Sequence, residues 1–191
     1  TGVRVEALAG MNVFSMERGV GRRFQRACKR CADILVGLIV LPVATIASLG
    51  YRLYGTMGGH VKWFAERRVG RGGRMIAWPR VVGSAGREAG DLVKPGLFLS
   101  LVSGRLSLVG PPALADGYPA SCSGALARVR PGITGAWRVG REETARRALE
   151  EEALGLESWS IEEDLMVIAS SAGAMVSGKY PAWFYTKGES V

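Results

Sequence analysis

The residues of this 191-residue sequence that could carry out chemistry are cysteines, acidic pairs and a group of arginines. Cys28 and Cys31 have the spacing of half a zinc site, but no second Cys or His pair completes four ligands. Glu142, Glu143 and the acidic run 150–152 offer oxygen ligands, and an exposed helix face is the favoured interpretation. The sequence therefore predicts thiols on a helix face and no metal site.

Four arginines follow closely after the apolar part of the sequence: Arg67, Arg68, Arg71 and Arg74. Guanidinium groups bind phosphate oxygens, so this group suits a pyrophosphate or, as the favoured interpretation, the headgroups of anionic lipids. The glycines at 70–73 are too few for a nucleotide-binding fingerprint and predict a hairpin turn. The net charge is +8, but the basic residues flank an apolar segment, so nucleic acid is not the expected partner.

The apolar segment covers residues 34–51, which include no charged side chain. A helix of this length reaches about 27 Å, close to the hydrocarbon thickness of a bilayer. Pro42 removes a hydrogen bond in its middle, and basic residues lie on both sides, which predicts a helix-break-helix that enters one leaflet and returns. Lys29, Arg30 and Arg52 are expected to contact lipid phosphates. A buried helix of a soluble protein is the alternative.

Other elements follow from periodicity and turn signals. Residues 16–30 have the spacing of an interfacial amphipathic helix, and residues 61–64 and 75–82 predict two strands of a hairpin. Two further helices are expected at 141–154 and 161–176, the second with an acidic first turn. The sequence therefore predicts an α/β protein.

Four regions organise the chain in this interpretation. They are an N-terminal arm (1–21), an interfacial and re-entrant membrane helix (22–53), a cytoplasmic domain (54–178) and an aromatic C-terminal tail (179–191). The tail has the sequence YPAWFY at 180–185. Because Trp and Tyr favour both protein interfaces and headgroup depth, we expect the tail to be an exposed docking or interfacial element.

Several motifs occur in an order that carries a resemblance. SLVGP at 107–111 is followed by RPGITG at 130–135, and Lys29, Arg30 and Asp33 precede the apolar segment. In this order the chain resembles the bacterial sugar transferases, the monotopic polyprenyl-phosphate phosphoglycosyl transferases, over about residues 22–175. The resemblance implies a membrane-associated phosphoglycosyl-transferase-like domain on the cytoplasmic face of the bacterial inner membrane, with a re-entrant helix, a short β-hairpin and surrounding amphipathic helices.

The family's catalytic positions are changed in this sequence. Counted back from Ser107 without gaps, the adjacent Asp-Glu pair of the family falls on Val93 and Lys94. Valine has no lone pair with which to attack phosphorus, and a lysine repels Mg²⁺. A further family Asp is Arg105 here, and the Arg of its GPRP motif is Pro112. We therefore expect a degenerate site with no catalytic residue and no cofactor.

Five arginines are expected to remain as phosphate contacts: Arg68, Arg71, Arg80, Arg130 and Arg141. The sequence thus predicts a non-catalytic membrane-bound homologue that acts as an accessory or scaffold subunit. Its expected partners are the bilayer, a polyprenyl phosphate or anionic lipid, and an integral membrane protein. One alternative is an active transferase that uses Mg²⁺ to move a sugar phosphate from a UDP-sugar to polyprenyl phosphate, with Asp91 as a displaced nucleophile. Another is a peripheral lipid-binding module.

Overall fold

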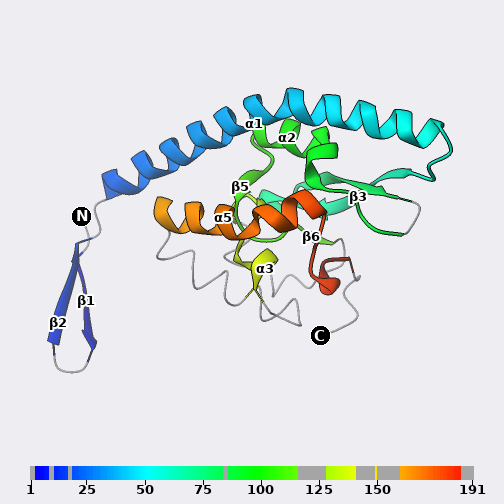
Figure 1. The fold of residues 1–191 in the computed structure, drawn as a ribbon. Coiled ribbons are helices and arrows are strands. Elements are labelled where there is room, and N and C mark those ends of the chain that lie inside the picture. The colour runs from blue at the N-terminus through cyan, green and yellow to red at the C-terminus, as the bar shows by residue number, and fades with distance from the viewer. Residues whose placement is uncertain are drawn as a thin grey trace. The chain divides into compact units, whose positions relative to one another are not determined.

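The computed structural model describes residues 3–8, 11–16, 19–83, 86–115, 128–140, 149 and 160–185. The chain divides into two compact units, Thr1–Ala32 and Asp33–Val191. The described residues form a mixed α/β protein with a long N-terminal apolar helix and three small sheets (Figure 1). The predicted α/β class is therefore confirmed at this level.

The first unit begins with a hairpin. Strands β1 (Val3–Leu8) and β2 (Met11–Met16) pair in antiparallel fashion. The two strands contain three valines and one phenylalanine, which favour extended backbone. The predicted N-terminal arm thus contains a two-stranded sheet that the sequence does not predict.

Helix α1 (Gly19–Thr56) runs without interruption through Pro42. The break expected at this proline is therefore wrong. Proline lacks one N–H donor, so it removes one bond of the helical ladder, while the turns on either side keep theirs. The Thr45 hydroxyl also donates a hydrogen bond to the Leu41 carbonyl at 2.8 Å. Continuity on both sides of Pro42 leaves one long helix in place of two short ones.

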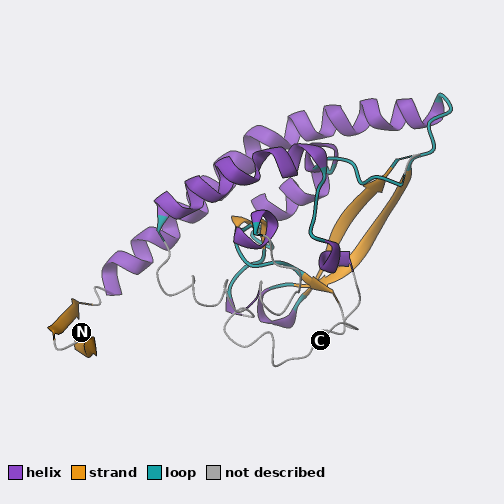
Figure 2. Cartoon of the chain, turned by 60° about the horizontal axis from the view of Figure 1, so that its bottom comes forward, coloured by secondary structure: helices purple, strands orange, loops and turns teal. Residues whose placement is uncertain are grey.

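A hairpin follows α1, as the sequence predicts. Strands β3 (Lys62–Val69) and β4 (Met75–Val82) pair in antiparallel fashion across the short helix η1 (Arg71–Gly73) (Figure 2). Strand β3 extends well past the predicted 61–64. Its far end also pairs with β6 (Leu114–Ala115), so β3 is the central strand of this sheet.

The remaining elements are short, apart from one helix. They are η2 (Asp91–Val93), α2 (Pro95–Val102), β5 (Ser107–Val109), β7 (Gly132–Thr134), α3 (Ala136–Val139), α5 (Ile161–Ser177) and η5 (Ala182–Tyr185). Strands β5 and β7 pair in parallel, so the SLVGP and RPGITG motifs lie side by side. A Cβ on Gly132 would lie 2.2 Å from the Gly110 nitrogen, so this close pairing requires glycine.

Helix α5 agrees closely with its prediction. Ser160 and Glu163 form a capping box, in which each side chain bonds the other residue's backbone nitrogen. Its first turn carries three acidic residues, which favour the positive end of the helix dipole. The other predicted helix, 141–154, lies outside the described residues except for Leu149.

The core of the second unit is rich in aromatic residues. Trp78, Trp137 and Phe98 are buried, together with Trp183 and Phe184 of the C-terminal tail. The Trp137 and Phe184 rings stack with 5.0 Å between their centroids. The prediction of an exposed aromatic tail is therefore wrong for Trp183 and Phe184, because these rings complete the core.

Candidate functional site

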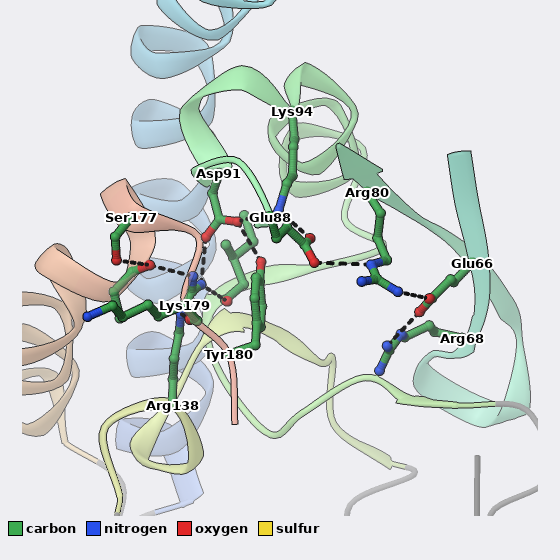
Figure 3. Close-up of polar contacts among 12 residues, drawn as sticks. Glu66, Arg68, Arg80, Glu88, Asp91, Lys94, Arg138, Ser177, Lys179 and Tyr180 are labelled. Carbon is green, nitrogen blue, oxygen red and sulfur yellow. Dashed lines mark hydrogen bonds and ion pairs between the residues drawn. The ribbon is translucent and has the colours of Figure 1, made fainter. Parts of the chain in front are cut away.

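The position assigned to the second acid of the family pair is occupied by a buried ammonium group. Lys94 is fully buried, and its Nζ donates hydrogen bonds to Glu88 Oε1 at 2.7 Å and Asp91 Oδ1 at 3.2 Å (Figure 3). The turn of η2 brings Lys94 over Asp91, since the Lys94 nitrogen donates to the Asp91 carbonyl at 2.9 Å. A backbone bridge between Val82 and Glu88 holds Glu88, the other carboxylate bound to Lys94, beside β4. The ammonium thus lies between two carboxylates.

Asp91 is itself fully buried and has two further partners. Arg138 Nη1 donates to Asp91 Oδ2 at 2.6 Å, and the Tyr180 hydroxyl donates to Asp91 Oδ1. The other donors of the Arg138 guanidinium bond backbone carbonyls, including Lys179 O at 3.1 Å and Ala174 O at 3.0 Å. Burial, followed by the charge of Asp91, raises the pKa of Tyr180 well above 10.0, so its hydroxyl remains a proton donor. Asp91 therefore joins η2, α3 and the segment after α5.

The network continues from Glu88 to the β3–β4 hairpin. Arg80 Nε donates to Glu88 Oε2 at 3.1 Å, and Arg80 Nη1 donates to Glu66. Arg68 Nη2 donates to Glu66 Oε2 at 2.7 Å, and its Nη1 donates to the Ala113 carbonyl at 2.9 Å. Four cations thus connect with three carboxylates in one chain of contacts: Arg68, Arg80, Lys94 and Arg138 with Glu66, Glu88 and Asp91.

These contacts set the pKa values at the hairpin end of the network, which consists of Glu66, Arg68 and Arg80. Burial opposes ionisation of Glu66, but hydrogen bonds from Arg80 and Arg68 outweigh it, and the pKa of Glu66 falls below 4.5. Burial lowers the pKa of Arg68, although its hydrogen bond with Glu66 acts in the opposite direction. Burial, together with the nearby Glu88, raises the pKa of Tyr185. Arg68 and Arg80 also lie over the rings of Phe184 and Tyr185, at 3.8 and 3.7 Å from the centroids.

Asp91 is not accessible as a nucleophile in this arrangement. Asp91 is the nearest carboxylate to the expected catalytic position, and it is covered by the chain and bonded to Lys94, Arg138 and Tyr180. Val93 offers no polar atom in its side chain. Among the described residues, no group of three or more His, Cys, Asp or Glu is placed to hold a metal ion. The described polar groups are arranged to connect elements of the fold.

The predicted phosphate contacts are only partly assembled. Arg68 and Arg80 meet on Glu66, whereas Arg71 is exposed at the hairpin turn. Arg130 is half-buried, and its carbonyl lies beside Gly110. Arg141 lies outside the described residues. Two of the four described arginines therefore come together, and their guanidinium groups are engaged by an internal carboxylate.

The other two positions assigned from the family resemblance, Arg105 and Pro112, differ in burial. Arg105 is exposed at the turn after α2, and Pro112 is buried. Neither carries a contact that suggests catalysis.

The residues predicted to contact lipid all lie in α1. In the first unit, Lys29 and Arg30 are half-buried. In the second unit, Pro42 and Arg52 are exposed, and the Arg52 guanidinium lies 4.4 Å from the centre of the Trp63 ring. Among the described residues, the stretch Phe24–Thr56 is long and apolar enough to cross a membrane, and an 18-residue window within it has a mean hydropathy of 2.2. This composition is consistent with membrane association.

Asp33 is a motif residue whose contacts the sequence does not predict. It is buried and accepts hydrogen bonds from Ser107 Oγ and the Leu108 nitrogen, both at 2.9 Å. An acid at the border of an apolar segment was the available signal, because a buried carboxylate needs donors. Glu88 and Arg138 were also missed, since nothing in their local sequence reveals contacts with distant residues.

Comparison with known proteins gives no identification. No protein-family model matches the chain, and no curated protein matches it significantly.

Proposed function

We propose that the chain is a non-catalytic, membrane-bound homologue of the bacterial sugar transferases that serves as an accessory or scaffold subunit of a membrane complex. The observation that carries this proposal is the buried Lys94 ammonium between Glu88 and Asp91. A phosphoglycosyl transferase needs an accessible carboxylate for the sugar-bound phosphorus and for its metal. Here the corresponding position carries a cation, and the nearest carboxylate is fully engaged.

The transferase-like fold is supported by two structural relations between the quoted motifs. Strands β5 and β7 bring SLVGP and RPGITG together, and Asp33 of α1 accepts bonds from the first two residues of SLVGP. These contacts give the motif glycines and Asp33 structural roles that do not depend on catalysis. In this proposal the region 54–178 is a transferase-like scaffold stabilised by internal ion pairs.

The membrane part of the proposal rests on α1. Its apolar side chains and the basic residues on both sides suit the cytoplasmic face of the bacterial inner membrane. The expected ligands are anionic headgroups or a polyprenyl phosphate, and the expected protein partner is an integral membrane protein. No cofactor is part of the proposed role.

A turnover assay tests the proposed loss of catalysis. Purified full-length protein is incubated with UDP-sugars, polyprenyl phosphate and Mg²⁺, and UMP release is measured. We expect no UMP above a blank without protein. UMP release by the wild type would contradict the proposal and favour the active transferase. Loss of that release in Asp91→Asn, in a variant shown to be folded, would identify Asp91 as the displaced nucleophile.

The scaffold role has a separate test. Detergent extraction and affinity purification of the tagged chain should recover an integral membrane protein in stoichiometric amount. Recovery of the chain alone, under conditions that preserve other membrane complexes, would contradict the scaffold role.

A further inference from the structure

Helix α1 has two different faces within the second unit. Asp33, Gly37, Ala44 and Ser48 are buried and recur at helical spacing. The opposite face carries large apolar side chains at the same kind of spacing, and they are exposed: Leu35, Ile39, Ile46, Leu49 and Leu53. Ile39 and Ile46 are 70% and 72% exposed, which is unfavourable in water.

The inner face is attached to the rest of the second unit along its length. At one end, Asp33 accepts hydrogen bonds from the segment at Ser107. Further along, a Cβ on Gly37 would lie 2.7 Å from Val102 Cγ2, so a glycine is needed for α2 to pack there. Ala44 belongs to the core. At the other end, a Cβ on Gly55 would lie 3.4 Å from the Val61 side chain.

These contacts restrict how α1 can meet a bilayer. The part from Asp33 to Gly55 is about 33 Å long at 1.5 Å per residue, and its first and last turns contact the same compact unit. If this part crossed the bilayer, the attached domain would have to enter the hydrocarbon with its charged side chains. If it entered and returned at Pro42, the neighbouring Leu41 and Ala44 would have to leave the core against which they pack.

We infer that α1 from Asp33 to Thr56 lies in the plane of one leaflet, with its outer face in the acyl region and its inner face on the domain. This inference rests on the proposed membrane attachment and specifies its geometry. An in-plane helix of this kind buries its apolar face about 5–10 Å into the boundary between headgroups and acyl chains. The exposed aliphatic face is then removed from water without disturbing the core.

The composition of this surface favours an anionic lipid bilayer as its occupant. No acidic residue occurs between Asp33 and Glu66. Arg52 lies over the Trp63 ring, and Tyr54 is exposed nearby. Aromatic rings and cations of this kind are preferred at headgroup depth, whereas the outer face itself is aliphatic. The surface therefore matches the apolar and negatively charged layers of a membrane.

Depth measurements along the outer face test the inference. Full-length protein with Cys28, Cys31 and Cys122 replaced by serine provides the background. Single nitroxide labels are introduced at Leu35, Ile39, Ile46 or Leu53, and at the exposed Arg87 as the control. The protein is bound to vesicles of phosphatidylcholine and phosphatidylglycerol (3:1), and depth is measured by power saturation with oxygen and a nickel chelate.

We expect the labels at all four outer positions to lie at the same depth in the bilayer and the label at Arg87 to remain in water. A profile that is deepest at Ile39 and Ile46 and shallow at Leu35 and Leu53 would overturn the inference in favour of a re-entrant helix. A depth that changes steadily from Leu35 to Leu53 would overturn it in favour of a spanning helix. In both cases the proposed membrane attachment survives. Failure of every labelled protein to bind vesicles would instead contradict the proposed attachment itself.

Discussion

The region around Asp91 and the outer face of α1 distribute polar and apolar side chains in opposite ways. Asp91 and Lys94 are charged and have no exposed surface, whereas Ile39 and Ile46 are apolar and mostly exposed. The buried charges are tolerable because each has partners of opposite charge and hydrogen bonds. The exposed aliphatic face has no such compensation in water.

This difference separates the contacts that hold the chain together from the surface proposed to bind a membrane. Removing a partner from the network leaves an uncompensated charge in the interior, so its effect should appear in folding stability. Changing the outer face of α1 removes no internal contact, so its effect should appear in membrane binding. Variants of the network should therefore change folding stability, and variants of the outer face should change membrane binding.

The largest effect is expected for Asp91→Asn. The substitution keeps the shape of the side chain but leaves Arg138 and Lys94 without the charge they share, which should lower the free energy of unfolding by about 3–5 kcal/mol. Urea unfolding in detergent, followed by tryptophan fluorescence, measures the change. Glu162→Gln, on the exposed first turn of α5, is the matched control, with an expected loss of about 0.3–1 kcal/mol. Equal losses in the two variants would contradict a structural role for the network.

The second effect concerns the outer face. Ile39→Asp combined with Ile46→Asp removes two apolar side chains from lipid, each worth about 1.5–3 kcal/mol when buried, so vesicle affinity should fall by about 100-fold or more. Near-ultraviolet circular dichroism should not change, because neither side chain contributes to the core. The double variant with valine at the same positions should retain most of its vesicle affinity. Unchanged binding of the aspartate variant would show that another surface meets the membrane.

A smaller loss is expected for Lys94→Met. Without the ammonium, Asp91 still has Arg138 and Tyr180, and Glu88 still has Arg80. The free energy of unfolding should therefore fall by about 1–3 kcal/mol, less than in Asp91→Asn. Urea unfolding under the same conditions gives the comparison. A loss larger than that of Asp91→Asn would mean that Lys94, not Asp91, is the centre of the network.

The smallest effect is expected at the hairpin end and depends on pH. Because the pKa of Glu66 is lowered in the folded state, its ionised form stabilises the fold above about pH 4.5, and this stabilisation is lost as pH falls through the lower folded pKa. Glu66→Gln should therefore reduce stability by about 1 kcal/mol at pH 7. The difference between variant and wild type should shrink on acidification below pH 4.5. A difference that grows in acid would contradict the assigned direction.

The sequence predicted elements whose signals are local. The β3–β4 hairpin follows from two apolar runs around a glycine turn, and α5 follows from its apolar period and acidic first turn. The capping acid Glu163 lies within that same turn. Such signals need only a few neighbouring residues to be read.

The ion network could not be predicted because its partners are far apart in the chain. Arg138 lies 47 residues from Asp91, and Tyr180 lies 89 residues from it. The failed prediction at Pro42 has a related cause. A proline weakens a helix locally, but packing of Leu41 and Ala44 against the core keeps its two sides together. Burial of Trp183 and Phe184 was missed for the same reason.

Flotation with vesicles tests most directly whether the chain attaches to membranes through apolar contacts of α1. Wild-type protein is mixed with phosphatidylcholine–phosphatidylglycerol vesicles, washed with 1 M salt and centrifuged through a density gradient. Salt at this concentration screens exposed charges but does not weaken apolar burial. We expect the protein to float with the vesicles after the wash. Protein released into the dense fractions would contradict it and assign the binding to surface charge alone.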